Sequence, residues 1–156
     1  MGSKSSKIII GTKAFGQKEI DSKSILHFPE GIFAFEEYHK FVILPHKKGS
    51  QFFWLQSLDE PSLAFLTLRP HDILEKYEPE LLPDSLSLIE LDSWEKAQIY
   101  CIVTIPPNQP EKMTVNLQGP ILINPKKGLG GQFISADEKH LVRMPVLEII
   151  ESGGKL

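Results

Sequence analysis

The sequence predicts a mainly β protein: one antiparallel, barrel-like domain of the split-barrel type with one or two short helices. Short apolar runs follow one another closely, and proline and glycine separate them. Only one segment has helical spacing, and the chain has no internal repeat. A closed or nearly closed barrel also leaves no strand edge exposed. A two-sheet sandwich is the main alternative.

Five strands are predicted in the first half of the chain. Each is an apolar or β-branched run, and turn signals such as Pro29-Glu30-Gly31, Pro45 and Asp59-Glu60-Pro61 lie between them. Their close spacing favours a meander of antiparallel neighbours over parallel strands separated by helices. The five predicted strands span residues 7–11, 24–28, 41–44, 52–56 and 64–68.

The segment between residues 70 and 97 contains the predicted helix. Pro83-Asp84 is typical of a helix start, and Leu82, Leu86 and Ile89 share one helical face. The strand pattern then returns. Further strands are predicted at residues 98–105, 112–117, 121–124, 132–134 and 146–150.

The chain length sets the domain organisation. With 156 residues, the chain has the usual size of one domain and can bury one core. Hydrophobic residues make up 41% and charged residues 24%, which is typical of a globular protein. We expect the domain to span residues 7–150, between a flexible N-terminus at 1–6 and a flexible tail at 151–156. Nothing indicates an oligomer, so a monomer is expected.

The charge and the cysteine content restrict the function classes. The net charge is -3, and Arg69 and Arg143 are the only arginines. Nucleic-acid binders normally carry a basic, arginine-rich excess, so direct nucleic-acid binding is disfavoured and a basic protein partner fits. A lone cysteine, Cys101, fits a reducing compartment. No apolar stretch is long enough to span a bilayer, so we expect no membrane partner and a cytoplasmic protein.

No motif for catalysis, a metal or a cofactor stands out. The five histidines are scattered and no C-x-x-C accompanies them. Cys101 lies in a β-branched apolar run, where an inert core thiol is expected. Glu36 and Glu37 are neighbours whose side chains point apart. Residues 126–131 reverse the order of a phosphate-binding loop and predict a flexible hairpin turn.

The alternation of side chains along a strand limits where the aromatic residues can point. Consecutive Phe52, Phe53 and Trp54 must place side chains on both faces of a strand, so at least one faces away from the barrel interior. That residue is either covered by the helix or lies in a contact surface. By the same parity, Phe33 and Phe35 point to one side and are able to anchor a partner if a loop carries them.

Six segments, taken in order, closely resemble the FliW family of flagellar assembly factors. They include Phe28-Pro29-Glu30-Gly31-Ile32 and the run from Met113 to Asn124, and the resemblance extends from about residue 8 to about residue 146. Ala34 stands where a glycine is usual, Met144 where a histidine is usual and His140 where an aromatic is common. The other four segments are 35–36, 52–57, 59–65 and 102–106.

The resemblance implies a β-barrel-like bacterial protein without enzymatic activity or cofactor. Members of the family bind newly made flagellin and also the translational regulator CsrA, which represses flagellin messenger RNA. The two partners compete, so export of flagellin frees the factor to capture CsrA. The resemblance further implies that CsrA is antagonised allosterically, away from its RNA-binding surface, which couples flagellin translation to export.

We expect the partner surface near three motif segments that combine polar or charged residues with aromatic neighbours. A purely structural role is the alternative, in which the prolines and glycines shape turns and Met113 fills the core. The expected partner-binding residues are Glu30, Phe33, Phe35, Glu36, Asp59, Pro61, Lys112, Met113 and Asn116.

Two other functions stay open at this stage. Split-barrel folds also house flavins, so a small-molecule or flavin-binding protein is the first alternative. The second is a barrel that stacks single-stranded nucleic acid on Trp54 and the phenylalanines, although the charge argues against it.

Overall fold

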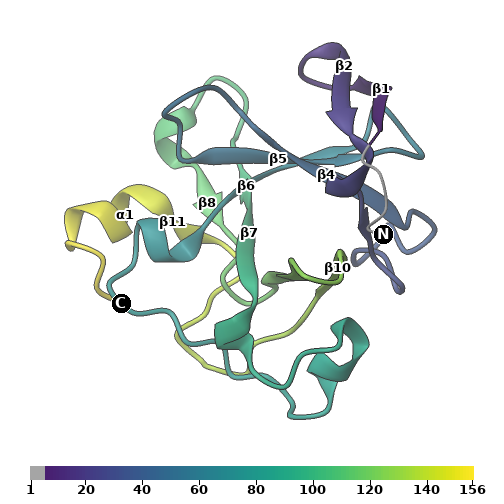
Figure 1. Ribbon diagram of the computed structural model, residues 1–156. Coiled ribbons are helices and arrows are strands. Elements are labelled where there is room, and N and C mark those ends of the chain that lie inside the picture. Colours follow the sequence, from purple (N-terminus) through teal and green to yellow (C-terminus); the bar gives the residue numbers. More distant parts are fainter. Residues whose placement is uncertain (1–5) are drawn as a thin grey trace.

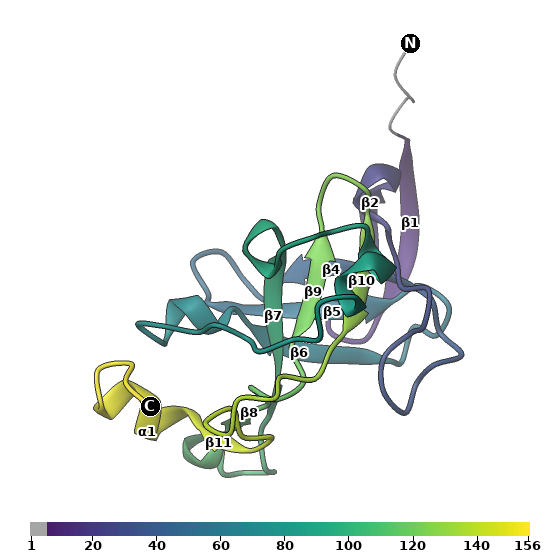
Figure 2. The same cartoon turned by 90° about the horizontal axis from the view of Figure 1, so that it is seen from below.

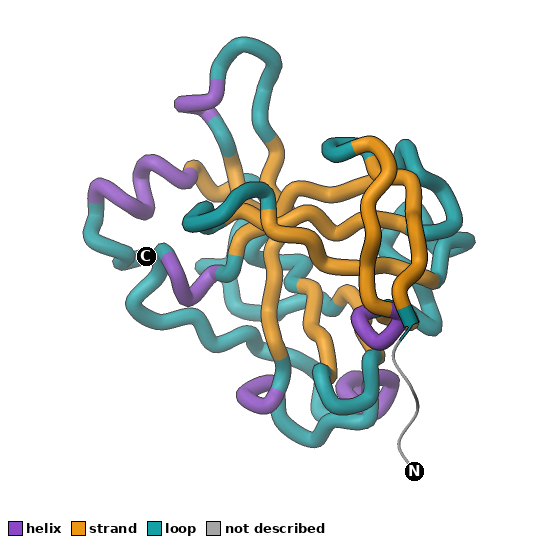
Figure 3. Tube along the Cα trace, turned by 45° about the horizontal axis from the view of Figure 1, so that its top comes forward, coloured by secondary structure: helices purple, strands orange, loops and turns teal. Residues whose placement is uncertain are grey.

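The computed structural model describes residues 6–156, and Figures 1–3 show the arrangement of the chain. Apart from Ser6, the expected flexible N-terminus at 1–6 lies outside the described residues. The strands are β1 Lys7–Thr12, β2 Gly16–Asp21, β3 Leu26–His27, β4 Lys40–Pro45, β5 Phe52–Ser57, β6 Ala64–Leu68, β7 Gln98–Thr104, β8 Thr114–Val115, β9 Ile121–Asn124, β10 Leu129–Gln132 and β11 Met144–Pro145.

Within residues 6–156 the helices are short, and only one of them is an α-helix. They are the 3₁₀ turns η1 Ser22–Ser24, η2 Pro70–Asp72, η3 Ser85–Ile89, η4 Trp94–Lys96 and η5 Pro110–Lys112, and the α-helix α1 Val146–Glu151. In the described chain, strands and loops thus form most of the structure, as Figure 3 shows.

Seven strands close into a barrel, which confirms the predicted single, mainly β, barrel-like domain. The ring runs β3-β4-β5-β6-β7-β9-β10, and β10 returns to β3. Because a ring with an odd number of strands cannot alternate direction throughout, at least one neighbouring pair must be parallel. That pair is β3 and β10, which meet at His27 and Leu129, so the barrel is mixed and not wholly antiparallel.

The strand alternation sorts the core into the barrel interior and two outer layers. The interior contains Phe28, Phe41, Leu55 and Tyr100. Cys101 is one of the residues that β7 turns to the largest outer layer, which the 70–97 segment and α1 cover. The β1–β2 hairpin covers a smaller layer on β4 that contains Ile10, Ile20, Val42 and Leu44.

The predicted parity of the 52–54 aromatics is confirmed. Phe53 packs on the barrel interior, whereas Phe52 and Trp54 pack on the two outer layers. A helix does not cover Trp54; the β1–β2 hairpin does, and the Trp54 indole Nε1 donates to His46 Nδ1 at 3.1 Å. The sequence offered no apolar run at β2, whose residues are mostly exposed, so this strand was not predicted.

The predicted last strand at 146–150 is wrong, because these residues form α1. Val146 and Ile149 are buried and lie one helical turn apart, while Leu147 and Ile150 are exposed. A strand would bury alternate residues instead. The β-branched residues favour a strand locally, but packing of the helical face decides the outcome.

The predicted helix near Pro83 exists as the short 3₁₀ turn η3. Leu86 and Ile89 are buried as expected, but Leu82 precedes the turn and is 77% exposed. The glycine-rich run 128–131 enters β10 and is not only a turn. A Cβ atom added at Gly130 would lie 2.5 Å from the Phe28 ring, so glycine lets this strand approach the ring.

The C-terminal residues fold back onto the segment after η2. The Glu75 amide donates to the Gly154 carbonyl at 3.0 Å, and the Gly154 amide donates to the Ile149 carbonyl at 2.9 Å. Gly154 is buried with φ of 87°. These contacts connect α1 to the 70–97 segment that covers the barrel.

Candidate binding surface

The loop between β3 and β4 carries the best candidate for a functional residue. The Gly31 φ of 67° turns the chain, and a Cβ atom there would lie 2.7 Å from the Glu36 Cα. A bridge between Ile32 and Phe35 then forms a tight turn with Phe33 at its tip. Ile32 is buried under the loop, whereas 49% of Phe33 is exposed.

Gln132 at the end of β10 fixes the position of Phe33. Its side-chain Oε1 accepts from the Phe33 amide at 3.0 Å, and its Nε2 donates to the Gly119 carbonyl at 3.0 Å. The tip of the loop is therefore attached to the barrel across a long sequence separation. A loop whose backbone is held in this way loses little conformational freedom when a partner binds.

Two hollows flank Phe33. One has a volume of about 520 Å³ and lies between the loop, the approach to η3 and the segment after β10. The other has a volume of about 410 Å³ and lies between the loop and β10. Both are lined by Glu30, Phe33, Leu88 and Gln132, so they form one groove. We call it the Phe33 groove.

The Phe33 groove combines apolar walls with an acidic rim. Besides Phe33, the apolar side chains of Leu82 and Ile134 line it and are 77% and 62% exposed. Glu30 and Asp84 line the larger hollow and Glu36 the smaller one. Among the described residues, no lysine or arginine lines either hollow.

The structure brings Glu30, Phe33 and Glu36 of the expected residues together. Phe35 does not point with Phe33, so that expectation is wrong: its ring packs edge-on against Phe65 at a centroid distance of 5.3 Å. The alternation of a strand does not apply, because Ala34 adopts φ of 72° between the two residues. Phe35 therefore packs against Phe65, which itself packs on the residues of the barrel interior.

Asp59 and Pro61 lie in the β5–β6 turn and make contacts within the protein. The Asp59 carboxylate accepts from the His39 and Lys40 amides at 3.3 and 3.4 Å. The Pro61 carbonyl accepts from the buried Gln56 Nε2 at 3.0 Å, and its ring lies close to Gly11. These contacts connect the turn to β1 and β4.

Lys112, Met113 and Asn116 lie elsewhere. They flank β8, which lies beside α1 at the end of the molecule opposite the loop after β3 (Figures 1 and 2). Met113 packs on the core and its carbonyl accepts from the Val146 amide, while Asn116 caps the Gly119 amide at 2.8 Å. The expected residues therefore do not form one continuous site.

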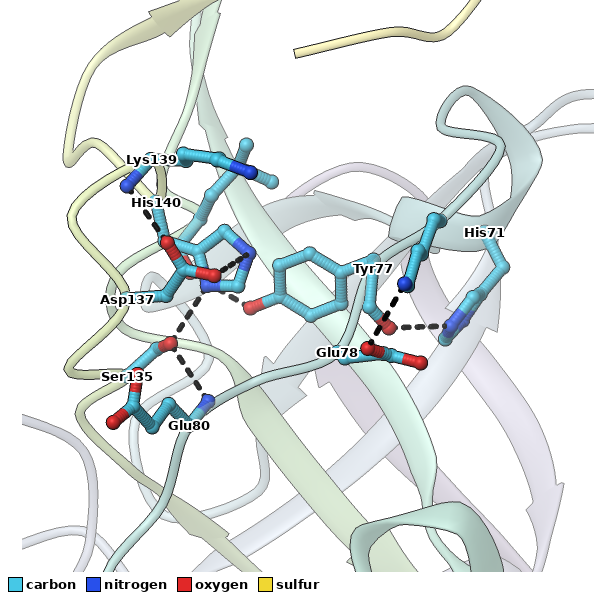
Figure 4. A network of polar contacts seen from close by, with 10 residues as sticks. His71, Tyr77, Glu78, Glu80, Ser135, Asp137, Lys139 and His140 are labelled. Atoms are coloured by element: carbon cyan, nitrogen blue, oxygen red, sulfur yellow. Dashed lines mark hydrogen bonds and ion pairs between the residues drawn. The ribbon is translucent and has the colours of Figure 1, made fainter.

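A buried polar cluster connects the 75–80 segment to the 135–140 segment (Figure 4). Ser135 Oγ accepts from the Glu80 amide at 3.0 Å, so its proton is free to donate to His140 Nδ1 at 2.6 Å. The Asp137 carboxylate lies 3.9 Å from His140 Nε2. The His140 ring packs against the Tyr77 ring in a tilted arrangement, with a centroid distance of 4.6 Å, which gives it the packing role of an aromatic residue.

This Ser-His-Asp set lacks the features of a nucleophilic site. Ser135 is 1% exposed and His140 is 4% exposed, so a substrate carbonyl has no access to the hydroxyl. Burial lowers the pKa of His140, and Asp137 partly opposes the shift. The Tyr77 hydroxyl donates to the Leu117 carbonyl at 2.7 Å, and burial raises its pKa. The cluster holds two loops together.

Cys101 is an inert core thiol, as predicted. It is fully buried, and burial raises the pKa of the thiol to about 12. Within residues 6–156, histidine, cysteine and carboxylate side chains form no group of three or more that would hold a metal ion. In the same part of the chain, no helix has the length and apolar character to cross a membrane.

Sequence reasoning missed several residues of the Phe33 groove. Leu82 was assigned to a helix face and Ile134 to a strand, and Gln132 carried no signal of its own. Pro83 directly after Leu82 was the one available hint that this leucine precedes the helical turn. The fold alone brings the three residues next to Phe33.

Fold and surface together define the class: a small single-domain, seven-stranded β-barrel protein with an open groove on its surface. The comparisons with known proteins then give the family. The family model described as FliW protein matches residues 9–146, which is most of the chain. The chain therefore belongs to the FliW family, whose members are non-enzymatic flagellar assembly factors, so it is not an enzyme, as the sequence predicts.

Individual relatives agree with this assignment. The flagellar assembly factor FliW of Leptospira biflexa is 43% identical over 144 residues, covering 92% of this chain and 94% of the relative. The protein of the same name from Treponema denticola is 36% identical over 146 residues, covering 94% and 98%. A crystal structure of the flagellar assembly factor FliW superimposes with a TM-score of 0.80 at 32% identity, covering 89% and 96%.

Proposed function

We propose that this chain binds flagellin and CsrA in competition, in the cytoplasm and as a monomer. Free chain captures CsrA and antagonises it allosterically, so that translation of flagellin follows its export. Membership of the FliW family over residues 9–146 supports the assignment to flagellar assembly. The observation that most favours protein binding is the Phe33 groove, because an exposed apolar cluster with a polar rim is typical of interaction sites.

The proposed partner surface has a centre and supporting parts. Glu30, Phe33 and Glu36 contact a partner directly, since their side chains line the groove. Phe35 and Asp59 act indirectly by fixing the loop and its connection to β4. The second group, Lys112, Met113 and Asn116, belongs to a separate surface at β8 and α1. Of these three residues, Lys112 is exposed and the other two are partly buried.

Titration calorimetry tests this function. The purified chain is titrated with CsrA from its own organism, and the titration is repeated with the chain saturated with flagellin. We expect saturable binding of CsrA in the first titration and a loss of the heat in the second. An unrelated protein of similar charge serves as the control competitor.

Either of two results overturns the proposal. Absence of heat with both partners at micromolar concentrations removes the binding function. Additive binding of CsrA and flagellin to the same chain removes the competition. A purified chain that carries a yellow chromophore points instead to the flavin-binding alternative.

A further inference from the structure

The Phe33 groove is built from three segments that are distant in sequence. Phe33 comes from the loop after β3, Leu82 from the approach to η3, and Ile134 from the segment after β10. All three are exposed by about half or more, although the core buries most other large apolar side chains. A convergent apolar surface of this kind is costly to leave in water unless a partner covers it.

The floor of the groove is preformed. The Phe33 amide is bonded to Gln132, and Gln132 is bonded to Gly119. Leu88 lines both hollows from the η3 side, close to the buried Ile89. A partner that inserts aliphatic side chains beside Phe33 therefore meets a rigid pocket and not a loop that must first become ordered.

The charges around the groove select the partner. Glu30, Glu36 and Asp84 are exposed acids at its rim, and no lysine or arginine among the described residues lines it to balance them. A second copy of this chain would bring the same acids face to face, which electrostatic repulsion opposes. An acidic segment is repelled for the same reason, whereas lysines or arginines flanking an apolar anchor are attracted.

We propose that the Phe33 groove is the docking site for a basic segment of a protein partner, in which aliphatic anchors enter the hollows beside Phe33 and flanking lysines or arginines meet Glu30, Glu36 and Asp84. The inference rests on the proposed function and assigns this groove to the basic, RNA-binding one of the two partners.

The affinities of single variants for CsrA measure how much the apolar side chains of the groove contribute to binding. We expect Phe33→Ala to weaken binding by about tenfold or more, because a preorganised aromatic at the centre of an interface contributes strongly. Ile134→Ser provides a second variant, with far-ultraviolet circular dichroism as the folding check for both. Ile9→Ser changes a similarly exposed residue of β1 away from the groove and should bind normally.

Two triple variants with the same net charge measure how much the acidic rim contributes to the affinity for CsrA. Glu30→Gln with Glu36→Gln and Asp84→Asn should weaken binding at low salt and flatten its dependence on ionic strength. Glu19→Gln with Glu95→Gln and Glu138→Gln changes the net charge equally at exposed positions off the groove and should retain most of the affinity. Equal losses in both sets would mean that only net charge matters, which overturns the local assignment.

A synthetic probe separates this inference from the proposed function. Fluorescence anisotropy compares a 14-residue peptide of lysine and leucine with the same peptide carrying glutamate for lysine. We expect only the lysine peptide to bind, and Phe33→Ala to weaken it. If all groove variants still bind CsrA as the wild type does, the groove is not the docking site, and the proposed function stands. If the groove variants lose binding of flagellin but keep binding of CsrA, the groove serves the other partner. If the lysine peptide does not bind the wild type, the groove does not recognise a basic segment with aliphatic anchors.

Discussion

At the scale of single residues, the turn that presents Phe33 contains an unusual backbone conformation. Ala34 has φ of 72°, a region that side chains with a Cβ atom adopt at a cost. The alanine therefore stores strain directly beside the residue that we place at the centre of the groove.

Replacing Ala34 by glycine should stabilise the protein. We expect Ala34→Gly to raise the free energy of unfolding by about 0.5–1 kcal/mol, because the relief of strain exceeds the entropy that glycine adds to the unfolded chain. Urea unfolding followed by circular dichroism measures the change. Ala136→Gly is the control, since Ala136 has no positive φ and its replacement should destabilise the protein. Equal effects at both positions would contradict the strain at Ala34.

His140 makes the stability depend on pH. Burial lowers its pKa in the folded state; Asp137 and Glu80 oppose that shift and Lys139 adds to it. The unfolded chain therefore binds the proton at a higher pH than the folded chain does. The stabilisation is complete above about pH 6.5, the ordinary pKa of histidine, and it is lost as the pH falls below that value.

The pH dependence has a direct test. The free energy of unfolding of the wild type should fall between pH 7.5 and 5.5, and that of His140→Asn should fall less. Asparagine retains an acceptor for Ser135 Oγ, whose bond to His140 Nδ1 is 2.6 Å, but it does not titrate. Parallel curves for the two proteins would show that other groups cause the dependence.

Single residues of the candidate site could be predicted only in part. Glu30, Phe33 and Glu36 lie in one short motif, so the sequence alone was enough to single them out. Leu82 and Ile134 could not be found, because their exposure depends on where η3 begins and where β10 ends, and local patterns place such boundaries poorly. Asp59 and Met113 looked like surface residues but hold turns and core together.

At the scale of elements, β10 shows how closely two strands can approach when one is glycine-rich. A Cβ atom at Gly130 would lie 2.5 Å from Cε1 of Phe28, a ring in the barrel interior, whereas one at Gly131 would lie 3.3 Å from the edge of the Phe133 ring. We expect Gly130→Ala to destabilise the protein by about 1–3 kcal/mol through overpacking. Gly131→Ala should cost less, and thermal unfolding compares the two.

The same comparison tests barrel closure. Phe28 directly follows β3, so a shift of its ring would disturb the parallel β3–β10 pair that completes the ring of strands. A larger loss for Gly131→Ala than for Gly130→Ala would mean that the packing of Phe133 matters more than closure. Far-ultraviolet circular dichroism confirms that both variants retain their strands.

The helix α1 offers a matched pair at neighbouring positions. Ile149 is fully buried in the core layer, whereas Ile150 is 54% exposed. Ile149→Ala should lower the free energy of unfolding by about 2–4 kcal/mol, because a large buried side chain leaves a cavity. Ile150→Ala should change it by less than about 0.5 kcal/mol. Urea denaturation of both variants measures the difference. Similar losses of stability would contradict the assignment of Ile149 to the buried face of α1 and of Ile150 to the exposed face.

Most elements were predictable and the exceptions have physical reasons. β4, β5, β6 and β7 follow long apolar runs with clear ends, so sequence and structure agree. β2 lacks a buried face, and so no hydrophobic pattern marks it. The run 146–150 is short enough to satisfy both a strand and a helix, and only the core that it meets favours the helix.

At the scale of the whole molecule, the three core layers share the same strands. β4 and β7 each contribute alternate residues to the barrel interior and to an outer layer. Loss of one layer therefore exposes the strands that support the next. A small single domain built in this way should unfold in one cooperative step.

The two tryptophans test that cooperativity, because they report on different layers. Trp54 lies in the layer under the β1–β2 hairpin and Trp94 in the layer under the 70–97 segment. In Trp94→Phe the fluorescence comes from Trp54, and in Trp54→Phe it comes from Trp94. We expect the urea midpoint by fluorescence to equal the midpoint by circular dichroism within each variant. An earlier fluorescence midpoint in Trp94→Phe alone would mean that the hairpin opens before the barrel, since Trp54 would enter water while the closed ring of strands persists.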